Sequence, residues 1–243
     1  IATYFQRNSQ LLATYKGNNS GSDLETELRS FDDYDYSRTS TISDIAIPAS
    51  PGINKRYYYF NQSHSATYNQ VFRVGKNGEL GINAAYLNDQ DERSNQSVTT
   101  TLLPDGSKNV VDERFNGILH RNIANGNITY MQNTERNYIK EQLKFDWLST
   151  DGHSNIYAGE DIAQENNVEN YRLHNLFHLT SRTGSDKGVE FLSKINLEKR
   201  PHSLSVAPNL FPDIIMSEQM FQSAERRNIS TENRLDFLSA IVW

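Results

Sequence analysis

Two stretches with alternating apolar and polar side chains, joined by a short glycine-bounded turn, constrain the fold of this chain most. Residues 171–180 and 189–198 each place apolar side chains mainly at every second position, and the polar sequence GSDKG (184–188) separates them. A period of two places successive side chains on opposite faces of a pleated strand. Two such runs with a short polar turn between them predict an antiparallel β-hairpin.

The length of these strands suggests what the apolar side faces. Residues 189–197 rise by roughly 26 Å at about 3.3 Å per residue. Tilted by about 40°, this stretch covers ~20 Å, which is close to the ~25 Å apolar band of an outer-membrane barrel. The hairpin therefore has the dimensions of a membrane-crossing β-ribbon.

Composition excludes several other classes of protein. The chain has 243 residues, a formal net charge of −6, 36% hydrophobic residues and no Cys. No run approaches the ~18–20 consecutive apolar residues of a membrane helix, whereas barrel strands need only alternate. The absence of Cys excludes a disulfide scaffold and a thiolate metal site. The acidic balance, without a Lys/Arg stripe, argues against a nucleic-acid partner.

Connections of two kinds alternate along the rest of the chain. The short turns fall at residues 17–22, 75–78, 133–137 and 184–188. The long polar stretches fall at about 32–55, 90–115, 150–169 and 200–228, and the second of them reads as a polar hairpin with its tip at 104–106. Short turns on one side and long loops on the other are typical of a transmembrane barrel, with the loops outside the cell. The sequence thus predicts an all-β antiparallel transmembrane barrel segment.

The number of strands indicates that this segment belongs to something larger. About nine to ten strands can be identified, among them residues 9–16 and 23–31, although the second stretch would also suit a helix. Single-chain bacterial barrels have even numbers of strands, and an open sheet would leave unpaired edges in lipid. Either a strand near the amino end escapes detection or the chain is a piece of a larger barrel. The second interpretation is preferred.

Alternation also predicts which side chains face lipid and which lie at its boundary. The lipid-facing candidates are Leu80, Ile82, Leu143, Phe145, Leu173, Phe177, Leu179, Val189, Phe191, Ile195, Leu197, Leu235, Phe237 and Ile241. Candidates for an interfacial aromatic girdle, near expected strand ends, are Tyr57, Tyr58, Tyr59, Phe60, Tyr86, Tyr138 and Trp147. In a soluble protein the same aromatic residues would be core residues.

The candidates for chemistry are few. His174 and His178 have the spacing of a helical zinc pair, but on a strand they lie about 13 Å apart, too far to share one ion. Asp89, Asp91, Glu92 and Asn95 resemble half of a calcium loop and leave a surface Ca²⁺ open, although the Gly and the closing Glu of an EF-hand are missing. Asp32, Asp33 and Asp35 are interpreted as a solvated loop, with contact to a substrate or a surface partner as the alternative. Because no catalytic set or phosphate-binding loop is recognisable, we expect that the chain is not an enzyme and holds no cofactor.

Three stretches suggest a family. Residues 137–147 (NYIKEQLKFDW), 167–196 and 200–206 (RPHSLSV) resemble the barrel domain of TonB-dependent outer-membrane transporters, in the branch with a carboxypeptidase-regulatory-like amino-terminal domain. The hairpin 102–115 is also similar, and the resemblance covers roughly residues 55–243. It implies an outer-membrane barrel of about 22 strands that imports a bulky nutrient through a plugged lumen. No stretch here resembles the plug domain or the coupling box of that family.

The resemblance also implies partners. They are the lipid bilayer, the remainder of the barrel and its plug domain, a TonB-type energy-coupling protein and, as a further candidate, a surface lipoprotein. Two other functions stay open at this point. One is a non-transporting barrel scaffold in an outer-membrane assembly, and the other is a soluble all-β binding module.

Overall fold

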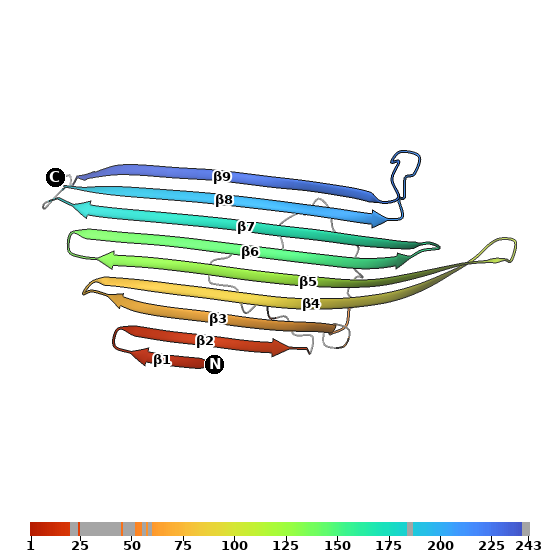
Figure 1. Cartoon of the computed structure of the whole chain (residues 1–243), viewed down its shortest axis with the longest axis horizontal. Helices are drawn as coiled ribbons and strands as arrows, with labels where there is room; N and C mark the ends of the chain where they lie inside the picture. Colours follow the sequence, from red (N-terminus) through yellow and green to blue (C-terminus); the bar gives the residue numbers. More distant parts are fainter. Residues whose placement is uncertain are drawn as a thin grey trace.

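A single antiparallel sheet accounts for all the secondary structure in the computed structural model, which describes residues 1–19, 24, 45, 52–54, 57, 60–183 and 187–239. Within these residues nine strands pair in sequence order, each with its neighbours along the chain (Figure 1). The strands are β1 (Ala2–Gln6), β2 (Ser9–Asn18), β3 (Phe60–Val74), β4 (Gly78–Leu102), β5 (Lys108–Asn133), β6 (Asn137–Tyr157), β7 (Asp161–Arg182), β8 (Lys187–Ala207) and β9 (Met220–Ser239). The prediction of an all-β antiparallel fold is confirmed. None of the described residues belongs to a helix that is long and apolar enough to cross a membrane.

Tight turns close one end of the sheet. Residues 7–8, 75–77 and 134–136 join successive strands there, and Gly75 adopts the positive φ of +65° that such a turn needs. Backbone bonds tie adjacent turns together, since the amide of Asn133 donates to the carbonyl of Asn77 and that of Arg182 to Arg136. At the opposite end, residues 103–107, 158–160 and 208–219 make the connections, and the chain between β2 and β3 begins and ends there.

The polar hairpin predicted within 90–115 is confirmed, since β4 and β5 continue up to a turn at 103–107. Another expected long loop is mostly strand, which corrects the sequence prediction: 150–169 is the continuation of β6 and β7 up to a turn at 158–160. Of the stretch 200–228, only 208–219 connects strands. The stretch 32–55 lies almost entirely outside the described residues. These extensions are mostly polar, and their few apolar residues fall on both faces, so they lack the alternation that marks a strand although their backbones pair.

The amino end also differs from the prediction. The first strand, β1, was missed, and the first turn lies at residues 7–8, while β2 continues through Asn18 instead of ending at the expected turn 17–22. The predicted strand at 23–31 lies outside the described residues, apart from Leu24.

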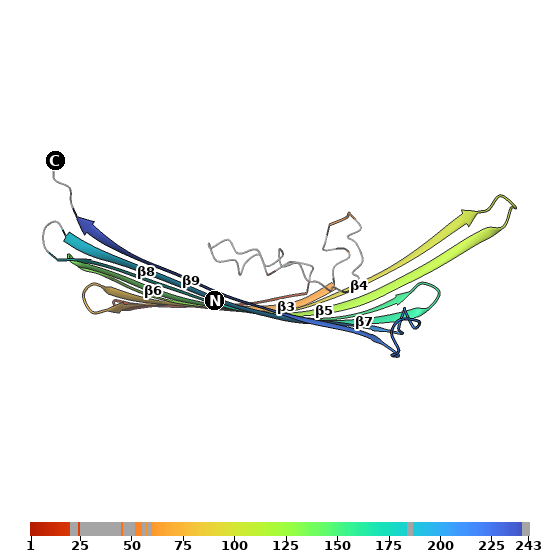
Figure 2. The ribbon, with the colours of Figure 1, turned by 90° about the horizontal axis from the view of Figure 1, so that it is seen from above.

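The described sheet is open, so closure into a barrel is not observed. β1 and β9 each pair with one strand only. Figure 2 shows the sheet twisted: at the end where β4 and β5 rise β9 descends, and at the opposite end β8 and β9 rise. The last pair that β4 makes with β3 is Glu92 with Phe60, and the last pair that β5 makes with β6 is Arg114 with Tyr157. Residues 93–102 pair with 108–117, and these two stretches are here called the outer hairpin; 97–102 and 108–113 pair only with each other. It projects beyond the other strands (Figure 1).

Register sorts the side chains onto two faces. Residues directly opposite each other in an antiparallel pair share a face. Phe145 pairs with Gly126 and Leu173, Leu173 pairs with Leu197, and Leu197 pairs with Ile229. The face that carries this row is called the apolar face. The adjacent row, on the other face, carries Asn83, Asn127, Lys144, His174, Asn196 and Ser230. That face is called the polar face.

The buried part of the molecule lies on the polar face. Leu24 packs with Leu87 and Ile123, which are 1% and 2% exposed, and Ala85 and Leu148 flank them. Beyond this cluster toward the outer hairpin lies a buried polar network. Arg121 contacts Asp89 at 2.6 Å and Arg93 contacts Asp91 at 2.7 Å. The hydroxyl of Ser63 donates to Asp89, and the amide of Asn61 donates to Ser63. The charges buried here are therefore paired, as burial requires.

The small apolar cluster leads to a prediction about the free energy of unfolding. Leu87→Ala removes a nearly fully buried side chain and leaves a cavity, so we expect it to lower the free energy of unfolding by about 2–4 kcal/mol. Val98→Ala in the outer hairpin, where the side chain is 58% exposed, should change it by less than about 0.5 kcal/mol. Urea unfolding of both variants under identical conditions measures the difference. Equal midpoints would contradict a core at this position.

Candidate functional site

The residues predicted to face lipid lie together. All the described members of that set share the apolar face, on β4, β6, β7, β8 and β9, and none of them is buried. Leu235 and Phe237 are 55% and 79% exposed. Ile241 lies outside the described residues. A carboxylate on this face, that of Glu141, accepts a hydrogen bond from the amide of Asn175. The alternation in the sequence thus maps onto one continuous exposed surface.

This surface ends along a straight line. The pairs Tyr86–Ala124, Ala124–Trp147, Trp147–Tyr171, Tyr171–Lys199 and Lys199–Arg227 form one row across β4 to β9, here called the boundary row. The row continues through Ala66 to Tyr15 on β2. Beyond it the same face turns polar, with Ser149 on β6 and Glu169 on β7. From residue 139 to the boundary row at residue 147, β6 rises by about 26 Å, or ~20 Å across a membrane if tilted by about 40°.

The predicted aromatic girdle is only partly in this row. Tyr86 and Trp147 lie in it, and Tyr57 is 73% exposed outside the sheet. Tyr138 lies on the polar face, edge-on to the His178 ring at 5.3 Å between ring centroids. Tyr58, Tyr59 and the side chain of Phe60 lie outside the described residues. Besides two alanines, four aromatic or cationic members of the row were not predicted as boundary residues: Tyr15, Tyr171, Lys199 and Arg227. Only the register between distant strands reveals them.

The polar face carries amides and paired charges. Arg172 contacts Glu198 at 2.9 Å, and Arg200 bonds the same carboxylate. The amide of Asn196 donates to Ser230 at 3.1 Å and its oxygen contacts the His174 ring. Such a surface can exchange hydrogen bonds with water and with polar solutes.

The metal candidates are separated by the fold. His178 contacts Glu190 at 2.8 Å while His174 contacts Asn196, so the two rings have different partners on β8. Among the described residues no group of three or more His, Asp or Glu side chains is placed to hold a metal ion. Asp89 and Asp91 point to the polar face, and each pairs with an arginine. Glu92 lies on the opposite face because strand side chains alternate, so the half calcium loop expected from the sequence is a strand. Asp32, Asp33 and Asp35 lie outside the described residues.

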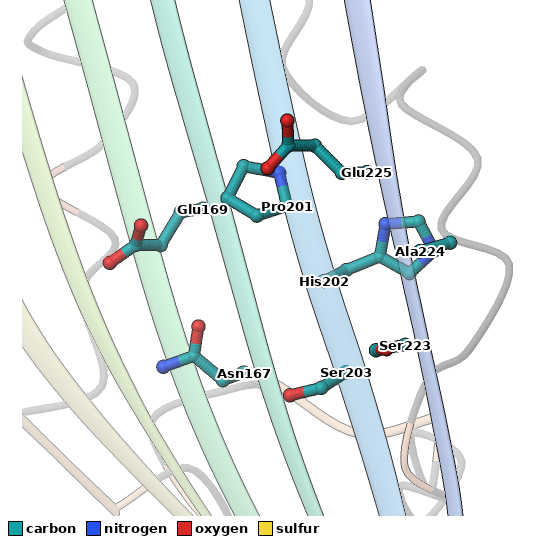
Figure 3. A pocket seen from close by; sticks show the side chains of 8 residues that line it. All are labelled: Asn167, Glu169, Pro201, His202, Ser203, Ser223, Ala224 and Glu225. Carbon is teal, nitrogen blue, oxygen red and sulfur yellow. The ribbon is translucent and has the colours of Figure 1, made fainter.

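Two depressions meet at the boundary row, on β6 to β9. A groove of about 260 Å³ on the apolar face is lined by Phe145, Leu173, Leu197 and Ile229, with Tyr171, Lys199 and Arg227 at its outer end. Directly beyond it is a hollow of about 470 Å³. Figure 3 shows the eight residues that line the hollow: Asn167, Glu169, Pro201, His202, Ser203, Ser223, Ala224 and Glu225.

Pro201 explains why the hollow forms here. A proline has no backbone N–H and cannot donate to a neighbouring strand. The β7–β8 pairing correspondingly lacks residue pairs between Val168–His202 and Tyr171–Lys199. Glu169 and Glu225 stand on either side of Pro201 (Figure 3). The break in the ladder thus coincides with the hollow.

Charged groups follow a fixed order across the boundary row. The ammonium of Lys199 lies 3.5 Å from the carboxylate of Glu225, and Arg227 bonds that carboxylate too. The hydroxyl of Tyr171 donates to Glu169 at 2.7 Å. Moving outward on β9, the apolar Ile229 is followed by the cation of Arg227 and then by the carboxylate of Glu225. On β7 a tyrosine takes the middle position, and on β8 a proline takes the outer one.

The outer hairpin has its own electrostatics. The pKa of the Asp112 carboxyl lies below its usual value, chiefly because the Arg114 guanidinium donates a hydrogen bond to it at 2.8 Å and Gln96 donates another at 3.0 Å. A carboxyl with a lowered pKa in the folded state favours folding above its unfolded pKa. That contribution is lost as the pH falls through the lowered value.

This pairing can be tested by titration. Arg114→Gln removes the main cause of the shift, so we expect the pKa of Asp112 to rise toward its ordinary value. NMR titration of the labelled side-chain carboxyl measures it. Lys108→Gln, at the tip of the same hairpin, should leave it unchanged. An unchanged pKa in the Arg114 variant would exclude the pairing.

Known proteins offer no identification. No family model matches the chain, and no curated protein matches it. The resemblance of residues 137–147, 167–196 and 200–206 to TonB-dependent transporters therefore stays a prediction. What the molecule does has to be argued from its two faces and from the boundary between them.

Proposed function

We propose that this chain forms part of the wall of a β-barrel in the outer membrane of a Gram-negative-type bacterium, in a transporter of the TonB-dependent type. One observation carries the proposal: the exposed apolar face ends at a single row across eight strands, and this row carries an aromatic or cationic side chain on six of them and alanine on β3 and β5. Interfacial belts of aromatic residues with flanking cations are typical of membrane–water boundaries.

The exposed apolar surface supports lipid as its surroundings. Soluble monomers rarely expose contiguous apolar patches above a few hundred Å². Here apolar side chains on β4 and on β6 to β9 lie exposed or half-buried on one face. In lipid these side chains avoid the free-energy cost of exposing apolar surface to water. The apolar face is ~20 Å high when the strands are tilted, which is near the height of a barrel's apolar band.

The polar face supports a water-filled lumen on the other side. Lys144, Arg172 and Glu198 lie in the part of the sheet whose opposite face is apolar. Charged side chains at this depth are tolerated where they face a polar interior and pair with one another. The same strand thus presents one side to lipid and the other to water.

The open edges support a larger assembly. Among the described residues β9 pairs with β8 alone, and each backbone group left without a partner costs several kcal/mol in hydrocarbon. Further strands must therefore pair with β9 in a membrane. The outer extensions of β4 to β9 then stand in the aqueous medium, with the outer hairpin as their longest part. Import of a bulky nutrient, a plug domain and a TonB-type partner rest on the family resemblance.

Insertion can be tested with single cysteines, because the chain contains none. Ile128→Cys, Leu143→Cys and Leu197→Cys report on the apolar face, and their neighbours Asn127→Cys, Lys144→Cys and Asn196→Cys report on the polar face. A fluorophore attached to each in reconstituted vesicles should be quenched by bromine-labelled acyl chains on the apolar face only, because side chains alternate. Equal quenching of both sets would refute the barrel wall.

Growth experiments distinguish a transporter from a non-transporting scaffold. Deleting the gene should abolish growth on at least one nutrient too large for general diffusion pores, and the wild-type gene should restore it. A protonophore should stop uptake of that nutrient while the amount of protein in the outer membrane stays constant, because energy reaches such transporters from the inner membrane. Unimpaired growth on every nutrient of a broad panel would favour the scaffold.

A further inference from the structure

The strip of β7 to β9 that crosses the boundary row combines three chemistries in a fixed order. The groove is lined mainly by apolar side chains, the row behind it carries a tyrosine on β7 and cations on β8 and β9, and the hollow beyond it carries carboxylates, hydroxyls and an amide. We propose that this strip binds a phosphorylated glycolipid of the surrounding membrane. Its acyl chain would lie in the groove, its phosphate on Lys199 and Arg227, and its sugar in the hollow. The inference rests on the proposed membrane function, since it requires lipid against this face.

The groove fits an acyl chain. Leu173, Leu197 and Ile229 occupy one row on three adjacent strands, and Phe145 extends that row onto β6. Together they line a depression of about 260 Å³ that opens toward the proposed hydrocarbon. The groove runs into the boundary row, so a chain lying in it would bring its headgroup to Lys199 and Arg227.

The two cations fit a phosphoryl group. The side chains of Lys199 and Arg227 are 49% and 72% exposed, and both contact one carboxylate, that of Glu225. Lysine and arginine together carry more N–H donors than one carboxylate can satisfy. The remaining donors are available to phosphoryl oxygens, which accept strong charge-assisted bonds. Glu169 faces the same region, but it accepts a hydrogen bond from Tyr171.

The hollow distinguishes a glycolipid from a simple phospholipid. Asn167, Ser203 and Ser223 present an amide and two hydroxyls there, and Glu169 and Glu225 present carboxylate oxygens (Figure 3). Sugar hydroxyls both donate and accept, so they match this mixture. The hollow measures about 470 Å³, which leaves room for a headgroup larger than glycerol. In this arrangement the carboxylates accept hydrogen bonds from the sugar hydroxyls just beyond the phosphate.

Binding is measured on the purified protein in detergent, by native mass spectrometry and thermophoresis. The probes are diphosphoryl lipid A, the same lipid with both phosphates removed, phosphatidylglycerol and inorganic phosphate. We expect diphosphoryl lipid A to bind most tightly. Removal of its phosphates should weaken binding, phosphatidylglycerol should bind more weakly because it leaves the hollow empty, and millimolar inorganic phosphate should not compete.

Matched variants locate the site. Lys199→Gln with Arg227→Gln should weaken lipid A binding by about thirtyfold. Each cation near an anionic membrane surface strengthens binding by roughly fivefold, and the double variant removes two of them. Lys194→Gln with Arg234→Gln changes the same residue types on the same two strands, but on the polar face, and should leave lipid A binding unchanged. Ser203→Phe fills the hollow without a change of charge. It should weaken lipid A binding and spare phosphatidylglycerol.

Several results would overturn the inference. They are an equal loss of lipid A binding in both cation pairs, phosphatidylglycerol binding as tight as lipid A, and displacement of the lipid by inorganic phosphate. Circular dichroism of every variant verifies that the β-sheet is intact. Failure of the cysteine quenching pattern would remove the membrane function itself. A normal quenching pattern with no effect of Lys199→Gln and Arg227→Gln would refute the lipid site alone.

Discussion

Antiparallel register is the constraint on which the rest of this molecule depends. Every strand pairs with its neighbour in sequence, so the position of one side chain fixes the face and height of those opposite it. A slip of one residue between β6 and β7 would move Leu173 and Phe177 to the polar face. Because the register holds across all the strands, local alternation becomes two continuous surfaces and a straight boundary.

The two faces contribute unequally to burial within the chain. The small cluster around Leu87 and Ile123, with the paired charges at Asp89 and Asp91, is the closest approach to a core. The apolar face buries little within the chain and relies on its surroundings. Lipid on that face, water on the other and further strands at the open edges would together complete the structure. The hollow at Pro201 shows how one missing donor in a ladder produces a local site on an otherwise uniform wall.

Residues with clear alternation were the ones that the sequence could predict. Leu143, Phe145, Leu173 and Leu197 were expected on one face, and the structure places them there. Tyr138 was expected in the interfacial aromatic girdle. It is an odd number of residues away from Phe145 on β6, so its side chain lies on the polar face. The polar hairpin at the outer ends of β4 and β5 was predicted from its turn residues, whereas the outer parts of β6 to β9 were predicted as loops because mostly polar residues give no clear periodic signal. The boundary residues Tyr15 and Tyr171 were missed because their alignment depends on β3 to β6, which lie between them.

The sequence by itself determined the β-structure, the division of each strand into two faces and the positions of turns such as 75–77 and 134–136, because these depend on side chains only a few residues apart. Only the tertiary structure decided the long polar extensions, the boundary row, the open sheet and the groove beside Lys199 and Arg227. Each of these arises from hydrogen-bond register between strands, and register joins residues distant along the chain.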